Sequence, residues 1–391
     1  MRRRLKGIGA IFMSVIVGVF MVISTTTVSF AKTNHENGKA PTAPFIKGAD
    51  ISSYQAIVDH GGVFYDHGQQ ENLLKILKDH GVNYIRLRLW VNPVQEDGYN
   101  NLANTIKVAS EAKAMGFKFL LDIHYSDTWA DPGKQTVPAA WQNDTFDQLT
   151  QQVHDYTVNV IRQLGLHNAA PDMVQIGNEI TSGMLWPYGK DWTSEGFDNL
   201  ATLLKAGISG VKANDPHAKI MLHIDQGGNN DTSRWFFDNI TQRDVPFDII
   251  GLSYYPYWHG TLAQLKNNMD DITVRYNKPV VIAETAYAYT LQDFDNEPNN
   301  FTADDVVQGY PATVQGQAKF MKDLTKTLFS VPNDQALGYF YWEPAWIPVQ
   351  GAGWIDGGGD GWDNQTLFDQ NGNALPSLNV FEMNRPVLTK H

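Results

Sequence analysis

From residue 45 onward, the chain alternates between two patterns of apolar residues. Short runs rich in β-branched and aromatic residues predict strands, whereas longer stretches with apolar residues every three or four positions predict amphipathic helices. The expected strands are residues 45–51, 83–90, 117–124, 173–179, 219–224, 248–254, 279–284 and 338–342. The expected helices are residues 69–80, 102–115, 145–164 (capped by Asp144), 197–214, 262–276 and 313–329.

This alternation of eight strands with helices predicts an α/β fold, a closed (β/α)8 TIM barrel, as a single domain over residues 45–391 with long loops after the strands. An open, doubly wound sheet is the alternative architecture. It requires a glycine-rich phosphate-binding turn after an early strand, and none follows Gly48. The glycine-dense stretch 351–361 comes after the last strand, so we interpret it as a loop.

The first 31 residues follow a different pattern. Three arginines and Lys6 precede an apolar run over residues 8–23, and a small-x-small site ends at Ala31. This order predicts a signal peptide over residues 1–31 and a secreted, extracellular protein. A transmembrane anchor is the alternative, but the run is shorter than the roughly 20 apolar residues that a span requires. Residues 32–44 are polar and rich in turn formers, which predicts an unpacked tail.

Composition narrows the possible chemistry. The 391 residues include no cysteine, which excludes disulfides, a cysteine nucleophile and a thiolate metal site. The formal net charge is −12 before removal of the leader, and losing the leader's four basic residues makes it more negative still. Because such a charge repels phosphates and anionic lipids, we expect no nucleic-acid partner and no membrane association after cleavage. We expect a monomer.

In a TIM barrel, the chemistry lies at the carboxyl ends of the strands. Tryptophans gather at or after these predicted ends. Any single tryptophan at such a position is readily explained as a residue that anchors a loop by packing. Together on one rim, however, their flat apolar faces suit the stacking of sugar rings. They are Trp90, Trp129, Trp141, Trp186, Trp192, Trp258, Trp342, Trp346, Trp354 and Trp362.

Glu179 and Glu284 each close an otherwise apolar strand. Glycoside hydrolysis needs two such carboxyl groups, one to protonate the leaving oxygen and one to attack or to activate water. Burial at a strand end raises the pKa of a carboxyl unless a partner offsets it. Asn178, beside Glu179, can bond a sugar hydroxyl. Two rim glutamates in ordinary ion pairs are the alternative interpretation.

Alternating residues on the second strand place Arg86 and Arg88 on the face opposite the aliphatic one, and therefore in the lumen. An arginine near Glu284 would keep that carboxyl ionised as a nucleophile while Glu179 stays protonated as the acid. We favour Arg88 for a functional role, because it lies nearer the strand end; a structural ion pair is an equal possibility for Arg86.

Other candidates at the strand ends are His124, Asp127, His223 and Tyr254. They are expected to orient the carboxylates or contact substrate, with satisfied core or loop residues as the alternative.

With these residues in place, the chain resembles glycoside hydrolase family 53, the arabinogalactan endo-β-1,4-galactanases, over about residues 45–381. The most specific segment is LDIHYSDTWADPGKQTVPAAW from Leu121. The other motifs are IRLRLWVNP, QIGNEI, GLSYYPYW, VIAETAY and GYFYWEPAW. The resemblance implies that Glu179 is the acid/base and Glu284 the nucleophile of a retaining enzyme that cleaves internal bonds of β-1,4-galactan, a pectin side chain. Independently of the resemblance, the residues at and after the strand ends that we predict to contact substrate are Asn178, Arg88, Trp90, His124, Asp127, Trp129, His223, Tyr254, Trp342 and Trp346.

The resemblance further implies a calcium ion between the loops after the seventh and eighth strands, and no organic cofactor. Oxygen-bearing side chains of the kind that calcium prefers occur in both loops. Histidine is expected at position 297 and serine at position 360, yet this chain has acidic residues at both. A solvated acidic loop is the alternative. The ligand candidates are Asp293, Asp295, Glu297, Asn299, Asp360 and Asp363.

Two competing functions remain open. A relative from the same clan would act on another β-1,4-glycan, such as mannan or glucan, although the segment from Leu121 disfavours it. A carbohydrate-binding barrel without catalysis would keep the tryptophan rim, but having both Glu179 and Glu284 argues against it.

Overall fold

The computed structural model describes residues 44–94, 98–192, 196–354 and 358–386. The predicted signal peptide (1–31) and all but the last residue of the predicted tail (32–44) lie outside the described residues. Within the described residues, no helix combines the length and the apolar character needed to cross a lipid bilayer.

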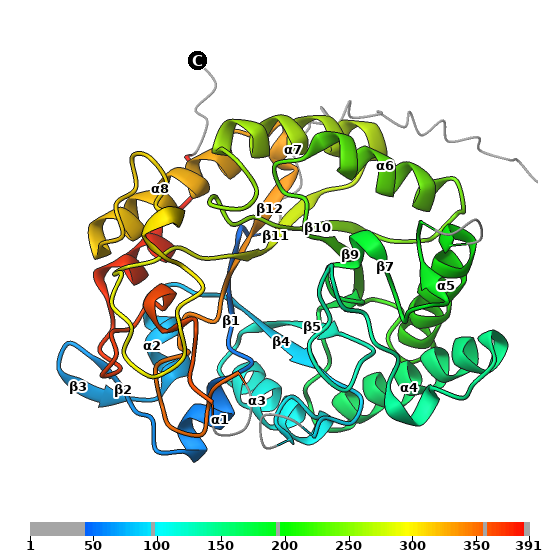
Figure 1. Ribbon diagram of the computed structural model, residues 1–391, viewed down its shortest axis with the longest axis horizontal. Coiled ribbons are helices and arrows are strands. Elements are labelled where there is room, and N and C mark those ends of the chain that lie inside the picture. Colours follow the sequence, from blue (N-terminus) through cyan, green and yellow to red (C-terminus); the bar gives the residue numbers. More distant parts are fainter. Residues whose placement is uncertain (1–43, 95–97, 193–195, 355–357, 387–391) are drawn as a thin grey trace, which may run out of the picture. The chain divides into compact units, whose positions relative to one another are not determined.

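Eight parallel strands close into a barrel, so the predicted TIM barrel is confirmed (Figure 1). Around the ring, the order is β1, β12, β11, β10, β9, β6, β5 and β4. The strands are β1 (Ile46–Asp50), β4 (Tyr84–Leu89), β5 (Lys118–Ile123), β6 (Met173–Ile176), β9 (Lys219–Ile224), β10 (Ile249–Ser253), β11 (Val280–Thr285) and β12 (Ala336–Trp342). All eight fall where the sequence predicts them.

Helices surround the barrel, and two short hairpins pair β2 (Phe64–Asp66) with β3 (Gln69–Glu71) and β7 (Gly183–Met184) with β8 (Gly189–Lys190). The helices are α1 (Tyr54–Asp59), α2 (Leu73–Asp79), α3 (Leu102–Ala114), α4 (Phe146–Leu166), α5 (Gly196–Asn214), α6 (Asn230–Thr241), α7 (Leu262–Tyr276) and α8 (Val314–Phe329).

Two expectations about the helices were wrong, and two helices lie outside the expected ranges. The predicted start of α2 at residue 69 belongs to strand β3, and Asn72 caps the helix by accepting from the Leu74 amide at 2.8 Å. The cap of α4 is Thr145 and not Asp144, because Thr145 and Gln148 form a reciprocal capping box. Helices α1 and α6 were not predicted.

The barrel interior is apolar in the half nearer the amino ends of the strands and polar in the half nearer their carboxyl ends. The apolar half contains a cluster of buried side chains from all eight strands: Ile46, Tyr84, Leu120, Met173, Met221, Ile249, Val281, Ala283 and Phe340. Gly48 leaves room for Phe340, since a Cβ there would lie 2.2 Å from the ring. This packed layer forms the floor beneath the polar groups at the carboxyl ends of the strands.

A bulge in β11 changes the direction of Glu284. Leu252 of β10 pairs with Ile282, but the next residue, Ser253, pairs with Glu284, so β11 carries one extra residue. Without the bulge, alternation from the inward-facing Ala283 would turn Glu284 toward the helices. Bulges next to functional sites commonly re-aim a side chain in this way.

Candidate active site

A cavity of about 1270 Å³ opens at the carboxyl ends of the strands and is lined by both Glu179 and Glu284. Of the other predicted substrate contacts, the cavity also includes Arg88, His124, Trp129, Asn178 and Trp342 in its wall.

Glu284 is held by two partners. Its Oε1 lies 2.8 Å from Arg86 Nη2, and its Oε2 accepts a hydrogen bond of 3.1 Å from the Tyr255 hydroxyl. Burial raises the pKa of Glu284 to about 7, and the positive charge of Arg86 opposes that rise. The arginine that contacts Glu284 is therefore Arg86, whereas the sequence favoured Arg88 for this role.

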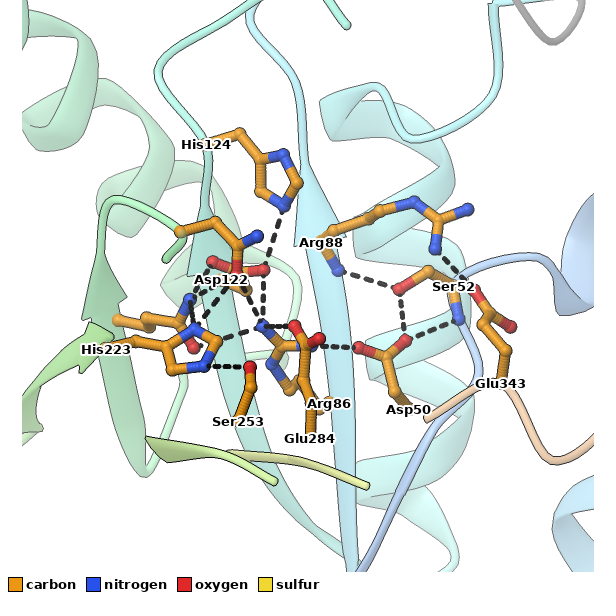
Figure 2. Close-up of polar contacts among 12 residues, drawn as sticks. Asp50, Ser52, Arg86, Arg88, Asp122, His124, His223, Ser253, Glu284 and Glu343 are labelled. Atoms are coloured by element: carbon orange, nitrogen blue, oxygen red, sulfur yellow. Dashed lines mark hydrogen bonds and ion pairs between the residues drawn. The ribbon is translucent and has the colours of Figure 1, made fainter. Parts of the chain in front are cut away.

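Arg86 lies at the centre of a buried charge network (Figure 2). Its side chain is 1% exposed and contacts Asp50 at 2.7 Å, Asp122 at 2.8 Å and the Asn178 side-chain oxygen at 3.0 Å. Each of these partners comes from a different strand end, so one guanidinium links four segments of the barrel rim. The position of Glu284 is thereby fixed before any substrate binds.

Glu179 has a strained backbone and a different environment. It lies three residues beyond the end of β6 in the left-handed region, at φ 46°. Its Oε1 accepts a 2.5 Å hydrogen bond from the Ser253 hydroxyl. Burial, followed by the charges of Glu284 and Asp225, raises the pKa of Glu179 well above its ordinary value. Because Arg86 stabilises the charge on Glu284, the proton of the pair resides on Glu179.

A chain of hydrogen bonds supports Glu179 from below. The Gln175 side-chain nitrogen lies 3.0 Å from His223 Nδ1, and His223 Nε2 lies 2.9 Å from the Ser253 hydroxyl oxygen. Burial lowers the pKa of His223 well below its ordinary value, so the ring is neutral. If Gln175 donates to Nδ1, then Nε2 carries the proton and donates to Ser253, which donates to Glu179. His223 thus contacts the site from the core and does not line the cavity.

His124 is also fixed in one tautomer. Its Nδ1 lies 3.2 Å from two donors, the Trp90 indole nitrogen and the Ala130 amide, which leaves Nε2 to donate to Asp122 at 3.0 Å. Trp90 itself is 0% exposed and lies behind the cavity wall. Trp90 was predicted to contact substrate, but its buried ring does not line the cavity. Its indole N–H instead donates to His124 and so helps to orient that ring.

Arg88 forms a second network. It pairs with Glu343, whose carboxylate also accepts from the Ser53 hydroxyl at 2.5 Å. The Arg88 guanidinium stacks 4.2 Å from the centre of the Trp129 ring. Arg88 therefore supports an aromatic wall.

That wall consists of tryptophans whose rings contact one another. Trp129 packs against Trp354 at 5.2 Å, and Trp342 packs against Trp362 at 4.6 Å. All four line the cavity. Trp346 stacks behind Trp129 at 6.2 Å but is 1% exposed and does not line the cavity.

Two further predicted residues lie away from the cavity. The Tyr254 ring is buried beside Phe320 of α8, and its hydroxyl donates to the Gly260 carbonyl. The inward-facing tyrosine is its neighbour Tyr255, which the sequence analysis missed. Strand alternation could have found it, because Ser253 and Tyr255 share a face. Asp127 accepts from the Asn92 and Ala139 amides and so anchors the loop after β5.

Part of the predicted metal site comes together. Asp293, Asp295 and Asp363 offer carboxylate oxygens that lie within 4.8 Å of one another. Asp363 is fully buried, and its Oδ1 has no hydrogen-bond partner. Burial raises the pKa of Asp363 to about 7. A buried, unpartnered carboxylate oxygen beside two further carboxylates fits a hard cation such as calcium.

The other three predicted ligands lie at the edge of this cluster. Asp360 Oδ2 and Asn299 Oδ1 are buried without hydrogen-bond partners. Glu297 donates its amide to Asp295 at 2.7 Å, and its side chain is outside the group of three carboxylates.

Cleavage of a glycosidic bond requires one carboxyl that donates a proton and a second that attacks carbon or activates water. Two buried carboxyl groups, Glu179 and Glu284, line one cavity, and the class of protein that such a pair indicates is a glycoside hydrolase. The sequence profile of Glycosyl hydrolase family 53 matches residues 46–381, and the chain belongs to that family.

Several relatives cover nearly the whole barrel. The Endo-beta-1,4-galactanase of Bacillus subtilis (strain 168) is 34% identical over 374 residues, covering 86% of this chain and 85% of that protein. The Arabinogalactan endo-beta-1,4-galactanase of Thermothelomyces thermophilus is 36% identical, covering 86% and 98%. The solved family 53 catalytic domain of Ignisphaera aggregans superimposes with a TM-score of 0.83 at 45% identity, covering 88% and 97%.

Proposed function

We propose that the protein is an endo-β-1,4-galactanase that hydrolyses internal bonds of galactan by double displacement with retention of configuration. The observation that carries the proposal is the pairing of Arg86 with Glu284 at 2.8 Å, facing a cavity that also contains the more basic carboxyl Glu179. The galactanases among its relatives support the choice of substrate.

In the first step, Glu284 attacks the anomeric carbon and forms a glycosyl ester while Glu179 gives its proton to the glycosidic oxygen. Arg86 and Tyr255 hold the attacking carboxylate in place. In the second step, Glu179 takes a proton from water, which attacks the same carbon and releases Glu284. The tryptophan wall binds the sugar rings that flank the bond.

The substrate class is tested by incubating the protein with linear β-1,4-galactan, β-mannan and carboxymethyl-cellulose in parallel and sizing the products. We expect a mixture of galacto-oligosaccharides from galactan alone. Cleavage of mannan or cellulose at a comparable rate would favour the rival clan relative, and binding of galactan without any cleavage would favour a carbohydrate-binding barrel.

Replacing Glu179 by Ala should lower the rate on galactan by about 10²–10⁴-fold, because the leaving oxygen then departs without a proton. In the parent, activity falls at low pH as Glu284 gains a proton and at high pH as Glu179 loses one. The variant should therefore lose the high-pH limb of its profile. The measurement is kcat/KM on galactan as a function of pH. If kcat/KM of the Glu179→Ala variant still fell at high pH as it does in the parent, that decrease would belong to another group.

We also propose that Asp293, Asp295 and Asp363 hold a calcium ion, with Asn299 and Asp360 nearby as further oxygen donors. The ion would join the loop after β11 to the loop after β12. A calcium concentration of 100 times Kd should stabilise the fold by about 2.7 kcal/mol. Differential scanning calorimetry should therefore record a lower Tm in EGTA, restored by calcium and not by magnesium.

The matched variant for this test is Asp363→Asn, which removes a charged ligand but keeps the shape of the side chain. Its Tm should no longer respond to EGTA. A parent Tm that is the same with and without chelator would contradict the site.

We propose further that residues 1–31 direct secretion and that the galactan side chains of pectin are the extracellular substrate. Expression of the full chain in a secreting bacterial host should give a culture-fluid protein whose first residue is Lys32. Retention of Met1 on a membrane-bound product would contradict this proposal.

A further inference from the structure

The two carboxyl oxygens of Glu179 have different surroundings. Oε1 accepts the 2.5 Å hydrogen bond from the Ser253 hydroxyl. Oε2 has no hydrogen-bond partner among the described residues, and it is not one of the buried polar atoms that lack a partner. Because the half-buried side chain of Glu179 lines the cavity, Oε2 is the oxygen that stays open to a substrate.

Ser253 is held rigidly at the end of β10. The residue is 0% exposed and pairs with Glu284 of β11. Its carbonyl accepts a hydrogen bond of 3.1 Å from the Gly227 amide, in the loop after β9. Among the described residues, its hydroxyl contacts two groups, Glu179 Oε1 and His223 Nε2. The position of the hydroxyl oxygen is therefore fixed, and only the direction of its hydrogen is left to choose.

The strand leaves room for the imidazole ring behind Ser253. Gly251 and Ser253 face the same side of β10, and Gly251 pairs with His223 of β9. A Cβ at Gly251 would lie 2.9 Å from the Met221 sulfur and 3.3 Å from His223 Cβ, closer than most side chains approach. Glycine at this position thus allows His223 to reach the serine.

His223 has a possible partner for either placement of its proton. Nε2 lies 2.9 Å from the Ser253 hydroxyl oxygen (Figure 2). Nδ1 lies 3.0 Å from a donor, the Gln175 side-chain nitrogen, and 3.0 Å from an acceptor, the Asn178 side-chain oxygen. Since burial lowers the pKa of His223 well below its ordinary value, the ring carries one proton, on Nδ1 or on Nε2.

Only a proton on Nε2 serves both charge states of Glu179. If Nδ1 carried the proton, Nε2 would need the Ser253 hydrogen, and an ionised Glu179 would need the same hydrogen at Oε1. One buried acceptor would then lack a donor, which costs free energy. With the proton on Nε2, His223 donates to Ser253 and Ser253 donates to Glu179, whether Glu179 is protonated or not.

We propose that Ser253 is a positioning residue whose hydroxyl, held by His223, occupies Oε1 of Glu179 and so keeps the catalytic proton on Oε2. The inference rests on the proposed function, in which Glu179 is the acid and the base. In the first step, the proton passes from Oε2 to the glycosidic oxygen. In the second step, Oε2 takes a proton from the attacking water, and the bond from Ser253 to Oε1 persists throughout. A donor aligned in advance spares reorganisation during the reaction.

The hydrogen bond from Ser253 also acts on the acidity of Glu179. Three charges face Glu179 and raise its pKa together with burial: those of Glu284, Asp225 and Asp131. The Ser253 hydroxyl opposes this rise, because it stabilises the carboxylate. Loss of the hydroxyl therefore raises the pKa of Glu179 further, and the high-pH limb of kcat/KM should move to higher pH.

The test compares two substrates that differ in their need for a proton. β-1,4-Galactotetraose releases a sugar, which leaves as a neutral alcohol, whereas 2,4-dinitrophenyl β-galactobioside releases a phenolate that needs no proton. Ser253→Ala should lower kcat/KM on the tetraose by about tenfold and leave kcat/KM on the dinitrophenyl substrate nearly unchanged. Its high-pH limb on the tetraose should lie above that of the parent.

Three further variants complete the design. Glu179→Ala should show a larger loss with the same preference for the tetraose. Ser253→Thr keeps the hydroxyl and should recover the tetraose rate and the parental high-pH limb. Thr273→Val removes a buried hydroxyl on α7 that donates to the Met269 carbonyl at 2.7 Å, outside the cavity, and should change neither rate.

A second measurement needs only the parent protein, so the proposal stays testable if Ser253→Ala does not fold. Heteronuclear NMR of the imidazole nitrogens should find the His223 proton on Nε2 across the pH range of activity. A proton on Nδ1 would overturn the inference. So would an equal loss on both substrates in Ser253→Ala, no loss on the tetraose, or an unmoved high-pH limb. A loss without substrate preference in Glu179→Ala would instead contradict the proposed function.

Discussion

Replacing Glu284 by Gln should abolish turnover of galactan, with a loss of at least about 10⁴-fold in kcat, because the amide cannot form the glycosyl ester. Glutamine is nearly the same size as glutamate and can still accept from Tyr255, so the fold and the binding of galactan should survive. Calorimetry and affinity electrophoresis in galactan check those two points.

A chemical rescue identifies the role of the side chain. In Glu284→Ala, azide can enter the vacated space and attack the anomeric carbon once, so an activated β-galactobioside should give the α-azide. In Glu179→Ala, azide should replace water in the second step and give the β-azide. Wild-type activity in Glu284→Gln, or a β-azide from Glu284→Ala, would show that Glu284 is not the nucleophile.

Replacing Arg86 by Met should destabilise the fold by about 3–5 kcal/mol, because it leaves Asp50, Asp122 and Glu284 as buried charges without their cation. The change can be measured as the urea midpoint at constant m-value. The matched control is Arg275→Met, which breaks an ion pair with Asp238 on the protein surface and should barely change the midpoint.

The same substitution should alter catalysis in a defined direction. Arg86 lowers the pKa of Glu284 against the effect of burial, so its loss raises that pKa further. Glu284 would then be protonated at a higher pH, and the low-pH limb of kcat/KM should move upward. An Arg86→Met variant with parental stability and an unmoved low-pH limb would contradict the role assigned to this network.

Most of the fold could be predicted from the sequence, because the alternation of inward-facing and outward-facing residues along a strand is a short-range pattern that tertiary packing does not change. The eight strands and the inward direction of Arg86 and Arg88 follow from periodicity. The helix α6 was missed because its buried residues Phe236, Phe237 and Ile240 follow a polar first turn.

The details of the site required three-dimensional information. Which arginine meets Glu284 depends on the bulge in β11, and a bulge leaves no mark in the apolar pattern around Ala283. Alternation from Ser253 predicts that Tyr255 faces inward, but the apolar pattern predicts that the strand ends one residue earlier, at Tyr254. Trp90 and Trp346 were predicted to contact substrate, but neither lines the cavity. The position of a tryptophan at a strand end does not show whether its ring lines the cavity or packs behind a residue that lines it.

The central claim is that this barrel hydrolyses β-1,4-galactan through an ester on Glu284. The most direct measurement is proton NMR of galactan hydrolysis during the first minutes, before the released reducing ends mutarotate. The double-displacement mechanism predicts that the β-anomer appears first and that the α-anomer grows in later. Initial release of the α-anomer, or no release of reducing ends from galactan, would contradict it.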